Sequence, residues 1–176
     1  MAGTSSTGRE EQFVVFRLGE ETYGLDIGAV QEIIVWQPVT RVPRTPEFME
    51  GIINLRGHVI PVIDLRRRFG LPAEARGRTT RIVVVEIGEM TVGFVVDAVS
   101  EVIRIPEDAI EPPSDIIAGV SSEFIRGIAR LDQQLIILLN PERILERTEQ
   151  ETLVEVQQEI ISAETEGDGS VPEGAS

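Results

Sequence analysis

The sequence has no cysteine and a single histidine, two residue types on which much enzyme chemistry and covalent stabilisation depend. It contains no cysteine, which excludes disulfides, thiolate nucleophiles and cysteine metal ligands together. It contains one histidine, His58, and none of the short motifs typical of phosphate loops, zinc proteases or serine hydrolases. We therefore expect a protein that is not an enzyme and that binds no metal or cofactor.

Long apolar runs are also missing. No stretch approaches the roughly 18 apolar residues that are needed to cross a bilayer. The segment MAGTSSTGREEQ, residues 1–12, has no apolar signal-peptide centre. We expect a cytoplasmic protein with no direct membrane insertion.

Positive charge is scarce: 16 basic residues, all of them arginine, stand against 30 acidic residues, and the net charge is -14. Eight of the acids lie between Thr148 and Ser176, where no base occurs, so residues 1–147 carry a charge of -6. An acidic body repels a phosphate backbone, and we expect no nucleic-acid partner. Residues 148–176 are predicted to be an acidic tail that is helical at first and disordered beyond about Ser162, and residues 1–10 to be disordered.

The sequence does contain an internal repeat. Residues 13–35, FVVFRLGEETYGLDIGAVQEIIV, align with residues 82–104, IVVVEIGEMTVGFVVDAVSEVIR, and about ten of the 23 positions are identical. A second unit, residues 48–64, aligns with residues 124–140. Order and spacing are kept, so the chain is predicted to be a duplication of one lobe.

The first repeat unit predicts a β-hairpin followed by a short helix. Gly19-Glu20 and Gly88-Glu89 form two-residue turns between β-branched and aromatic runs, and a leading glycine is typical of a type II′ turn. The apolar spacing of residues 29–34 and 98–102 indicates one face of a helix, with Asp97 as an N-cap.

The second unit predicts two strands, residues 52–55 and 58–63, joined by Arg56-Gly57, and residues 39–42 add a short strand. Five short strands per copy favour a small closed β-barrel. A barrel of about 60 residues is marginal alone, so the two barrels should share a hydrophobic core. The predicted units are lobe 1 at about 13–69, lobe 2 at about 80–140, and a C-terminal helix from residue 141.

Several side chains have simple structural interpretations. Asp64 and Asp97 are the carboxylates best placed for acid–base chemistry, but both precede predicted helices, which favours capping. His58 is expected to be an exposed strand residue, Arg66-Arg67-Arg68 a solvated helix face, and Ile33-Ile34 part of the core. A small-barrel enzyme and a structural homo-oligomer stay open as alternatives.

Three segments carry a resemblance to a known family. LGEETYGLDIGAVQEI, PVTRVPRTPEFMEGIINLRGHVIPVIDLRRRFG and VGFVVDAVSEV resemble CheW-like domains, and the likeness covers residues 11–147. It implies two five-stranded SH3-like β-barrels around a shared hydrophobic centre. It also implies a cytoplasmic adaptor that couples chemoreceptor tips to the regulatory domain of the histidine kinase CheA at membrane-associated arrays, with further copies of the chain in rings.

The resemblance also implies roles for particular residues. The receptor tip helix is expected in the groove between the two barrels, and the kinase at their open ends. A chemotaxis-like pathway with another output, such as surface motility or development, is the alternative setting. The residues that match by motif position are Val30, Glu32, Arg56, Val99 and Val102 for the receptor side, and Val42 and Pro43 for the kinase side.

Overall fold

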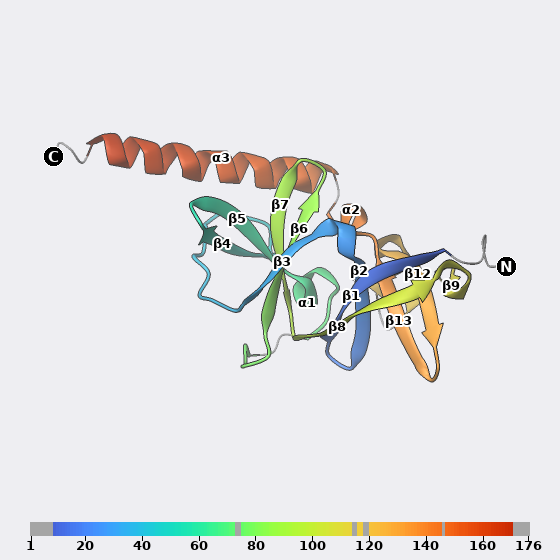
Figure 1. The fold of residues 1–176 in the computed structure, drawn as a ribbon. Helices are drawn as coiled ribbons and strands as arrows, with labels where there is room; N and C mark the ends of the chain where they lie inside the picture. Colours follow the sequence, from blue (N-terminus) through green and yellow to red (C-terminus); the bar gives the residue numbers. More distant parts are fainter. Residues whose placement is uncertain (1–8, 73–74, 114–115, 118–119, 146, 171–176) are drawn as a thin grey trace.

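Two mainly antiparallel β-sheets form the body of the protein in the computed structural model (Figure 1). The structure describes residues 9–72, 75–113, 116–117, 120–145 and 147–170. A two-stranded hairpin, β10 (Ile116–Ile117) and β11 (Val120–Ser121), completes the strands. Sheet 1 runs in the order β8 (Ala98–Pro106), β1 (Glu10–Leu18), β2 (Glu21–Asp26), β13 (Gln134–Leu139), β12 (Ile125–Leu131), β9 (Ile110–Glu111); sheet 2 runs β3 (Val30–Val35), β6 (Arg81–Ile87), β7 (Met90–Val96), β5 (His58–Asp64), β4 (Met49–Leu55). The prediction of a mainly β fold is confirmed.

The two sheets are copies of one another, but each is built from both halves of the chain. Replacing every strand of sheet 2 by its repeat partner gives β8-β1-β2-β13-β12, which is the order of sheet 1. The two parallel pairings match as well, because Leu138 lies opposite Gly24 and Val62 lies opposite Gly93. The prediction of two contiguous lobes, 13–69 and 80–140, is therefore corrected. The hairpin β1–β2 from the first half joins β12–β13 from the second half, and the hairpin β6–β7 joins β4–β5.

The two predicted helices after the hairpins are strands. Ile27–Ala29 forms one 3₁₀ turn, after which β3 pairs with β6, and residues 98–102 lie in β8. The register of β3 shifts between Val30 and Glu32. A bulge of this kind interrupts the two-residue alternation of a strand, which explains why the apolar spacing indicated a helix. The predicted strand at 39–42 is a single bridge, Thr40 to Ile52.

The core has three parts, which explains the continuous apolar runs FVVF and IVVV. A central cluster draws on both sheets and includes Phe16, Tyr23 and Phe94, while each sheet also has a smaller cluster of its own, around Phe13 in sheet 1 and Val62 in sheet 2. Strands that are buried on both faces need apolar residues at successive positions. The sheets thus pack around a shared core.

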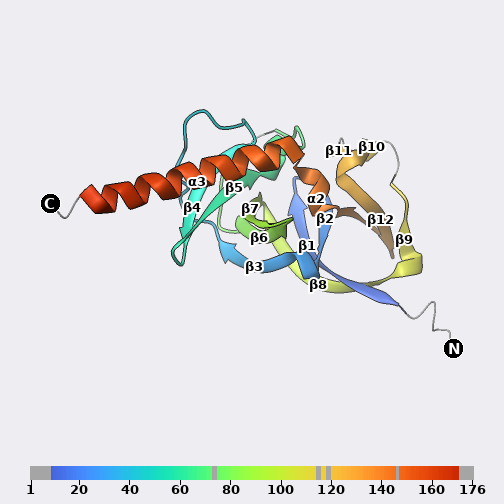
Figure 2. The ribbon, with the colours of Figure 1, turned by 90° about the horizontal axis from the view of Figure 1, so that it is seen from above.

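The C-terminal region forms two helices, α2 (Pro141–Ile144) and α3 (Arg147–Ser170), and α3 runs along sheet 2 and away from sheet 1 (Figure 2). The α3 helix extends past Ser162, where disorder was predicted, and β1 begins at Glu10, inside the predicted disordered start. Residues 1–8 and 171–176 lie outside the described part. Leu153, fully buried in the central cluster, anchors the helix.

The α1 helix (Leu65–Arg68) corrects the prediction of a solvated arginine face. Arg66 is buried, and Arg68 donates to both carboxylate oxygens of Glu149 at 2.8 and 3.0 Å and to the Ile144 carbonyl at 2.6 Å. Its guanidinium also stacks over Phe48 and Phe124. Arg68 thus joins the first half of the chain to α3.

Tyr23 offers a test of the central core. The side chain is fully buried, and its hydroxyl has no hydrogen-bond partner among the described residues; burial, with a smaller contribution from Glu21, raises the pKa of the phenol to about 12. The repeat partner of Tyr23 is Val92, which is equally buried. We expect Tyr23→Phe to raise the free energy of unfolding by about 1 kcal/mol, because a buried unpaired hydroxyl costs free energy. Urea denaturation at pH 7 measures it, and a loss of more than about 1 kcal/mol would show that the hydroxyl is bonded.

Candidate partner-binding surfaces

Four of the five receptor-side candidates lie on the two edge strands that the duplication relates. Val30 begins β3 and Val99 lies near the start of β8, and both are half-buried against the central cluster. Val102, further along β8, is 48% exposed. Because β3 and β8 each have only one neighbour in their sheet, one long side of each has no strand partner among the described residues. The structure therefore places the three valines on matching edges of the two sheets.

Three exposed apolar residues on or just before β3 were not among the predicted site residues. Ile33 and Val35 on β3 are 38% and 65% exposed, and Ile27, just before β3, is 38% exposed. Ile33 was predicted to be core, whereas its neighbour Ile34 does pack against the core of sheet 2. The repeat could have indicated that Ile33 is exposed, because Ile33 aligns with Val102, which was assigned to the surface.

Arg56 and Glu32 are brought together by the β4–β5 turn. Arg56 and Gly57 both have positive φ, 53° and 88°, as a type I′ turn requires, and Asn54 accepts a hydrogen bond from the Gly57 N–H at 2.9 Å. A positive φ is uncommon for arginine and costs backbone free energy, so placing Arg56 in this turn lowers the stability of the fold. The Arg56 guanidinium donates to the Glu32 carboxylate and is 69% exposed.

A hollow of about 310 Å³ surrounds this ion pair. His58 is exposed at its rim, as expected of a strand residue. The apolar lining comes from the ends of β4 and β5 and from the β6–β7 hairpin, and one wall is α3, through Gln157. An exposed guanidinium beside apolar groups is a common centre for protein binding.

The kinase-side candidates lie elsewhere. Val42 and Pro43 belong to the loop between β3 and β4, where the Thr45 hydroxyl donates to the Val42 carbonyl at 3.0 Å. This loop and Arg67 surround a separate hollow of about 450 Å³, which has neither Glu32 nor Arg56 in its lining. The structure thus separates the two sets of candidates.

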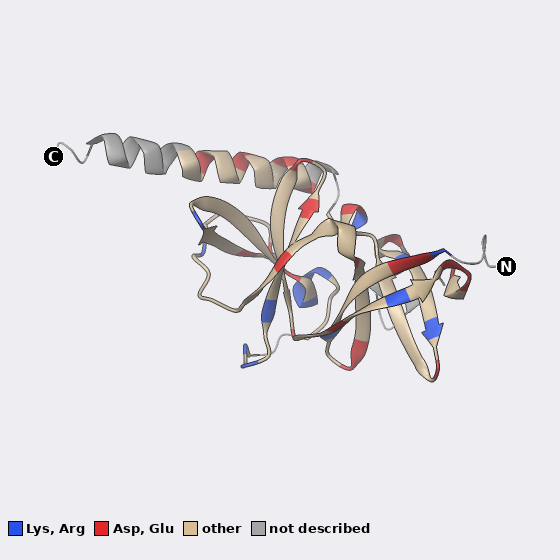
Figure 3. Ribbon diagram, viewed as in Figure 1, with Lys and Arg blue, Asp and Glu red and all other residues tan. Residues whose placement is uncertain are grey.

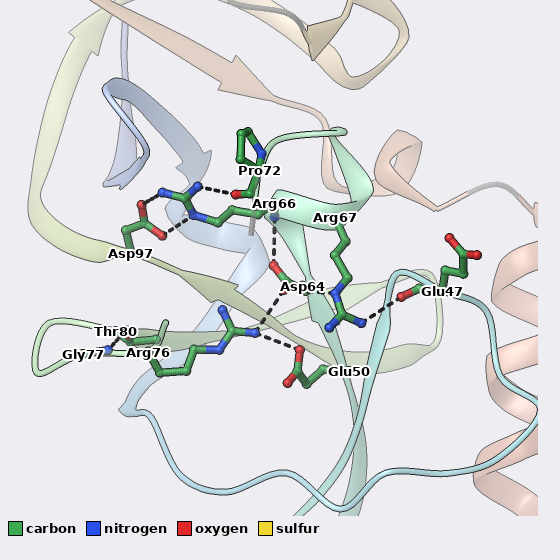
Figure 4. Close-up of polar contacts among 10 residues, drawn as sticks. All are labelled: Glu47, Glu50, Asp64, Arg66, Arg67, Pro72, Arg76, Gly77, Thr80 and Asp97. Carbon is green, nitrogen blue, oxygen red and sulfur yellow. Dashed lines mark hydrogen bonds and ion pairs between the residues drawn. The ribbon is translucent and has the colours of Figure 1, made fainter. Parts of the chain in front are cut away.

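The carboxylates that were considered for acid–base chemistry are held by arginines (Figure 4). Asp64 caps α1 as expected, accepting from the Arg66 N–H at 3.0 Å, and it also accepts from Arg76 at 3.0 Å. Asp97 caps no helix: it accepts from the Gly19 N–H at 2.7 Å and from Arg66 at 2.5 and 3.0 Å. The arrangement joins the two repeat copies, because Arg66 and Asp97 come from different halves.

The pKa of Asp97 gives a pH prediction. Burial alone would raise it, but hydrogen bonds from Arg66 and the Gly19 N–H, with the charges of Arg66 and Arg76, outweigh burial and lower the pKa of this carboxyl. A lowered folded-state pKa stabilises the fold above the unfolded value, and the gain disappears as pH falls through the folded value. We expect wild-type protein to lose more stability than Asp97→Asn between pH 6 and 3, measured by thermal melting. Parallel losses would contradict the assignment.

After Arg147 the described part of α3 carries acidic residues and no basic ones, whereas the sheets carry charges of both signs (Figure 3). Among the described residues no group of three or more histidine, aspartate or glutamate side chains is arranged to hold a metal ion. No helix in the same part of the chain is long and apolar enough to cross a membrane. Fold and surface together define a duplicated, mainly β protein in which the edge strands β3 and β8 are related by the repeat.

Known proteins are similar to this chain in sequence and architecture. A family model described as "CheW-like domain" matches residues 12–149. The chemotaxis protein CheW of Klebsiella aerogenes is 37% identical over 139 residues, which cover 79% of this chain and 84% of the relative. Protein FrzA of Myxococcus xanthus is 35% identical over 144 residues, 80% of this chain and 89% of the relative. The crystal structure of the scaffolding protein TtCheW from Thermoanaerobacter tengcongensis matches with a TM-score of 0.74 and 45% identity, covering 80% of this chain and 91% of that chain.

The chain therefore belongs to the CheW-like domain family. The match ends at residue 149, the third residue of α3. Most of the acidic helix thus lies outside the part that the family model describes.

Proposed function

We propose that the chain is a non-catalytic adaptor that couples the cytoplasmic tips of chemoreceptors to the regulatory domain of the histidine kinase CheA. The observation that carries the proposal is the pair of matching edge strands, β3 and β8. Four of the six large apolar residues that the described chain exposes lie on these strands or directly before β3: Ile27, Ile33, Val35 and Val102. An apolar strip with an adjacent exposed arginine is suited to binding a helix.

The relatives support the same role. Proteins named for chemotaxis and for scaffolding match most of the chain at 37% and 45% identity. In this proposal the receptor tip lies against Val30, Val99 and Val102 beside the Glu32–Arg56 pair. The kinase binds at the Val42–Pro43 loop, and further copies can join in rings. The protein would work in the cytoplasm, recruited to membrane-associated receptor arrays.

A pull-down with two purified partners tests the proposal. We expect a chemoreceptor cytoplasmic fragment and the CheA regulatory domain each to bind the chain, and to bind it together, because their sites are separate. Val42→Glu should weaken kinase-domain binding only. Competition between the two partners, or turnover of a substrate in a hydrolase and transferase screen, would contradict the proposal.

A second setting is the same adaptor role in a chemotaxis-like pathway with a different output, such as surface motility or development. The 35% identity to Protein FrzA, a relative that carries a name other than CheW, favours keeping this candidate. Deleting the gene and scoring swimming and surface spreading separately distinguishes the two settings.

A further inference from the structure

A groove along α3 continues the hollow at Arg56. A second hollow, of about 650 Å³, lies between α3 and the β6–β7 hairpin. It shares three residues with the Arg56 hollow: Glu89, Met90 and Gln157. The two hollows therefore form one surface that runs from the β4–β5 turn along the helix. We call the second one the α3 groove.

The α3 groove has firmly held walls. Leu153 is fully buried beneath the helix, and Glu149 is fixed by Arg68 through two hydrogen bonds. Gln157 donates from its side-chain amide to the Val59 carbonyl of β5. The lining includes apolar side chains from both walls, Ile87 and Met90 from the hairpin and Val154 from the helix. A preformed groove of this kind loses little conformational entropy when a partner binds.

The charge around the α3 groove is entirely negative. Glu89, Glu151 and Glu155 line it, and no arginine does. Within the described residues none of these three carboxylates forms an ion pair, and no base follows Arg147 in the sequence. Unpaired like charges beside an apolar floor favour a partner that brings positive charge.

Among the described residues, α3 covers sheet 2 at a position that is open in sheet 1. The repeat partner of Val59 is Leu135, at the start of β13. Val59 is 5% exposed beneath α3, whereas Leu135 is 49% exposed. The helix therefore makes the two ends of the duplicated fold different, and it does so next to the receptor-side candidates.

We propose that the partner surface at Arg56 extends along α3 and binds a basic amphipathic helical segment of the chemoreceptor tip. Apolar side chains of the segment pack on Met90 and Val154, and its lysine or arginine residues pair with Glu89, Glu151 and Glu155. This inference rests on the proposed function, because the occupant is the same receptor partner. It adds the chemistry of that partner and gives the acidic helix a role.

Titration calorimetry with a chemoreceptor cytoplasmic fragment tests the α3 groove. We expect the double variant Glu151→Gln/Glu155→Gln to bind about tenfold more weakly than wild type in low salt, and the difference to shrink as salt is raised. The matched control is Glu10→Gln/Glu107→Gln, which removes the same charge from two exposed positions, one at the start of β1 and one in the 3₁₀ turn after β8, and should bind like wild type. Equal binding by the two double variants would overturn the inference.

The outcome also separates this inference from the proposed function. If Arg56→Glu abolishes binding and the α3 double variant does not weaken it, the α3 groove is refuted while the adaptor proposal stands. If the fragment fails to bind the wild-type chain, both are refuted. Because both substituted glutamates are exposed, thermal melting should give unchanged stability for the α3 variant.

Discussion

Charge reversal at Arg56 should weaken binding of a chemoreceptor fragment by at least about 30-fold, which corresponds to about 2 kcal/mol at a central contact residue. In Arg56→Glu the guanidinium that donates to Glu32 is replaced by a second carboxylate. The two like charges repel each other and the hollow loses its exposed cation. Titration calorimetry at fixed salt measures the change.

The fold should survive this substitution because Arg56 is exposed and lies in a turn. The duplication supplies a matched control, since Asp132 occupies the same turn position in sheet 1, also with positive φ. We expect Asp132→Arg to bind the fragment like wild type. An equal loss in both variants would show that long-range charge, and not the Arg56 hollow, controls binding.

Loss of Arg66 should have the largest effect on stability. Its side chain is 5% exposed and donates to both oxygens of Asp97 and to the Pro72 carbonyl. Arg66→Ala leaves Asp97 without its main cation. Removing one partner of a buried ion pair costs about 3–5 kcal/mol, and because Asp97 is 30% exposed we expect a loss at the lower end of this range. Urea denaturation measures the free energy of unfolding.

The neighbouring arginine provides the control. The Arg67 side chain is 38% exposed, and its ion pair with Asp64 is long, at 3.6 Å. We expect Arg67→Ala to cost less than about 1 kcal/mol, as exposed ion pairs usually do. The pair Arg66→Ala/Asp97→Ala should lose less than the sum of its single variants, because the two side chains interact directly. Additive losses, or equal losses at Arg66 and Arg67, would refute the assignment.

Local features of this fold could be predicted from the sequence because local physics decides them. Gly19 and Gly88 have φ of 63° and 60° in two-residue turns, as the glycine-first pattern indicated. Asp64 caps α1, and Asn140-Pro141 starts α2. Each of these features depends on residues that are neighbours in the chain.

The exchange of strands between the two copies could not be predicted. Similar hairpins and similar second units can pair within a copy or between copies, and the apolar patterns of both arrangements are the same. The pairing is visible only in contacts such as β2 with β13 and β5 with β7, which join distant segments. The bulge between Val30 and Glu32 was hidden for a related reason, since pairing with β6 creates it.

The candidate surface was predicted in part. The motif positions indicated Arg56 and Glu32, and the structure joins them in one ion pair. Ile33 and Val35 were missed because exposure of an apolar strand residue depends on which side of the sheet is covered. The contribution of Gln157 to this hollow could not be predicted either, because the sequence does not show which surface the acidic helix covers.

We propose that edges contributed by both copies of the repeat form one receptor-binding surface. Amide hydrogen exchange of the chain with and without a chemoreceptor cytoplasmic fragment tests it most directly. We predict added protection in both β3 and β8, with smaller changes in β9 and β12. Protection confined to one of the two edges, or located on β9 and β12, would contradict the account.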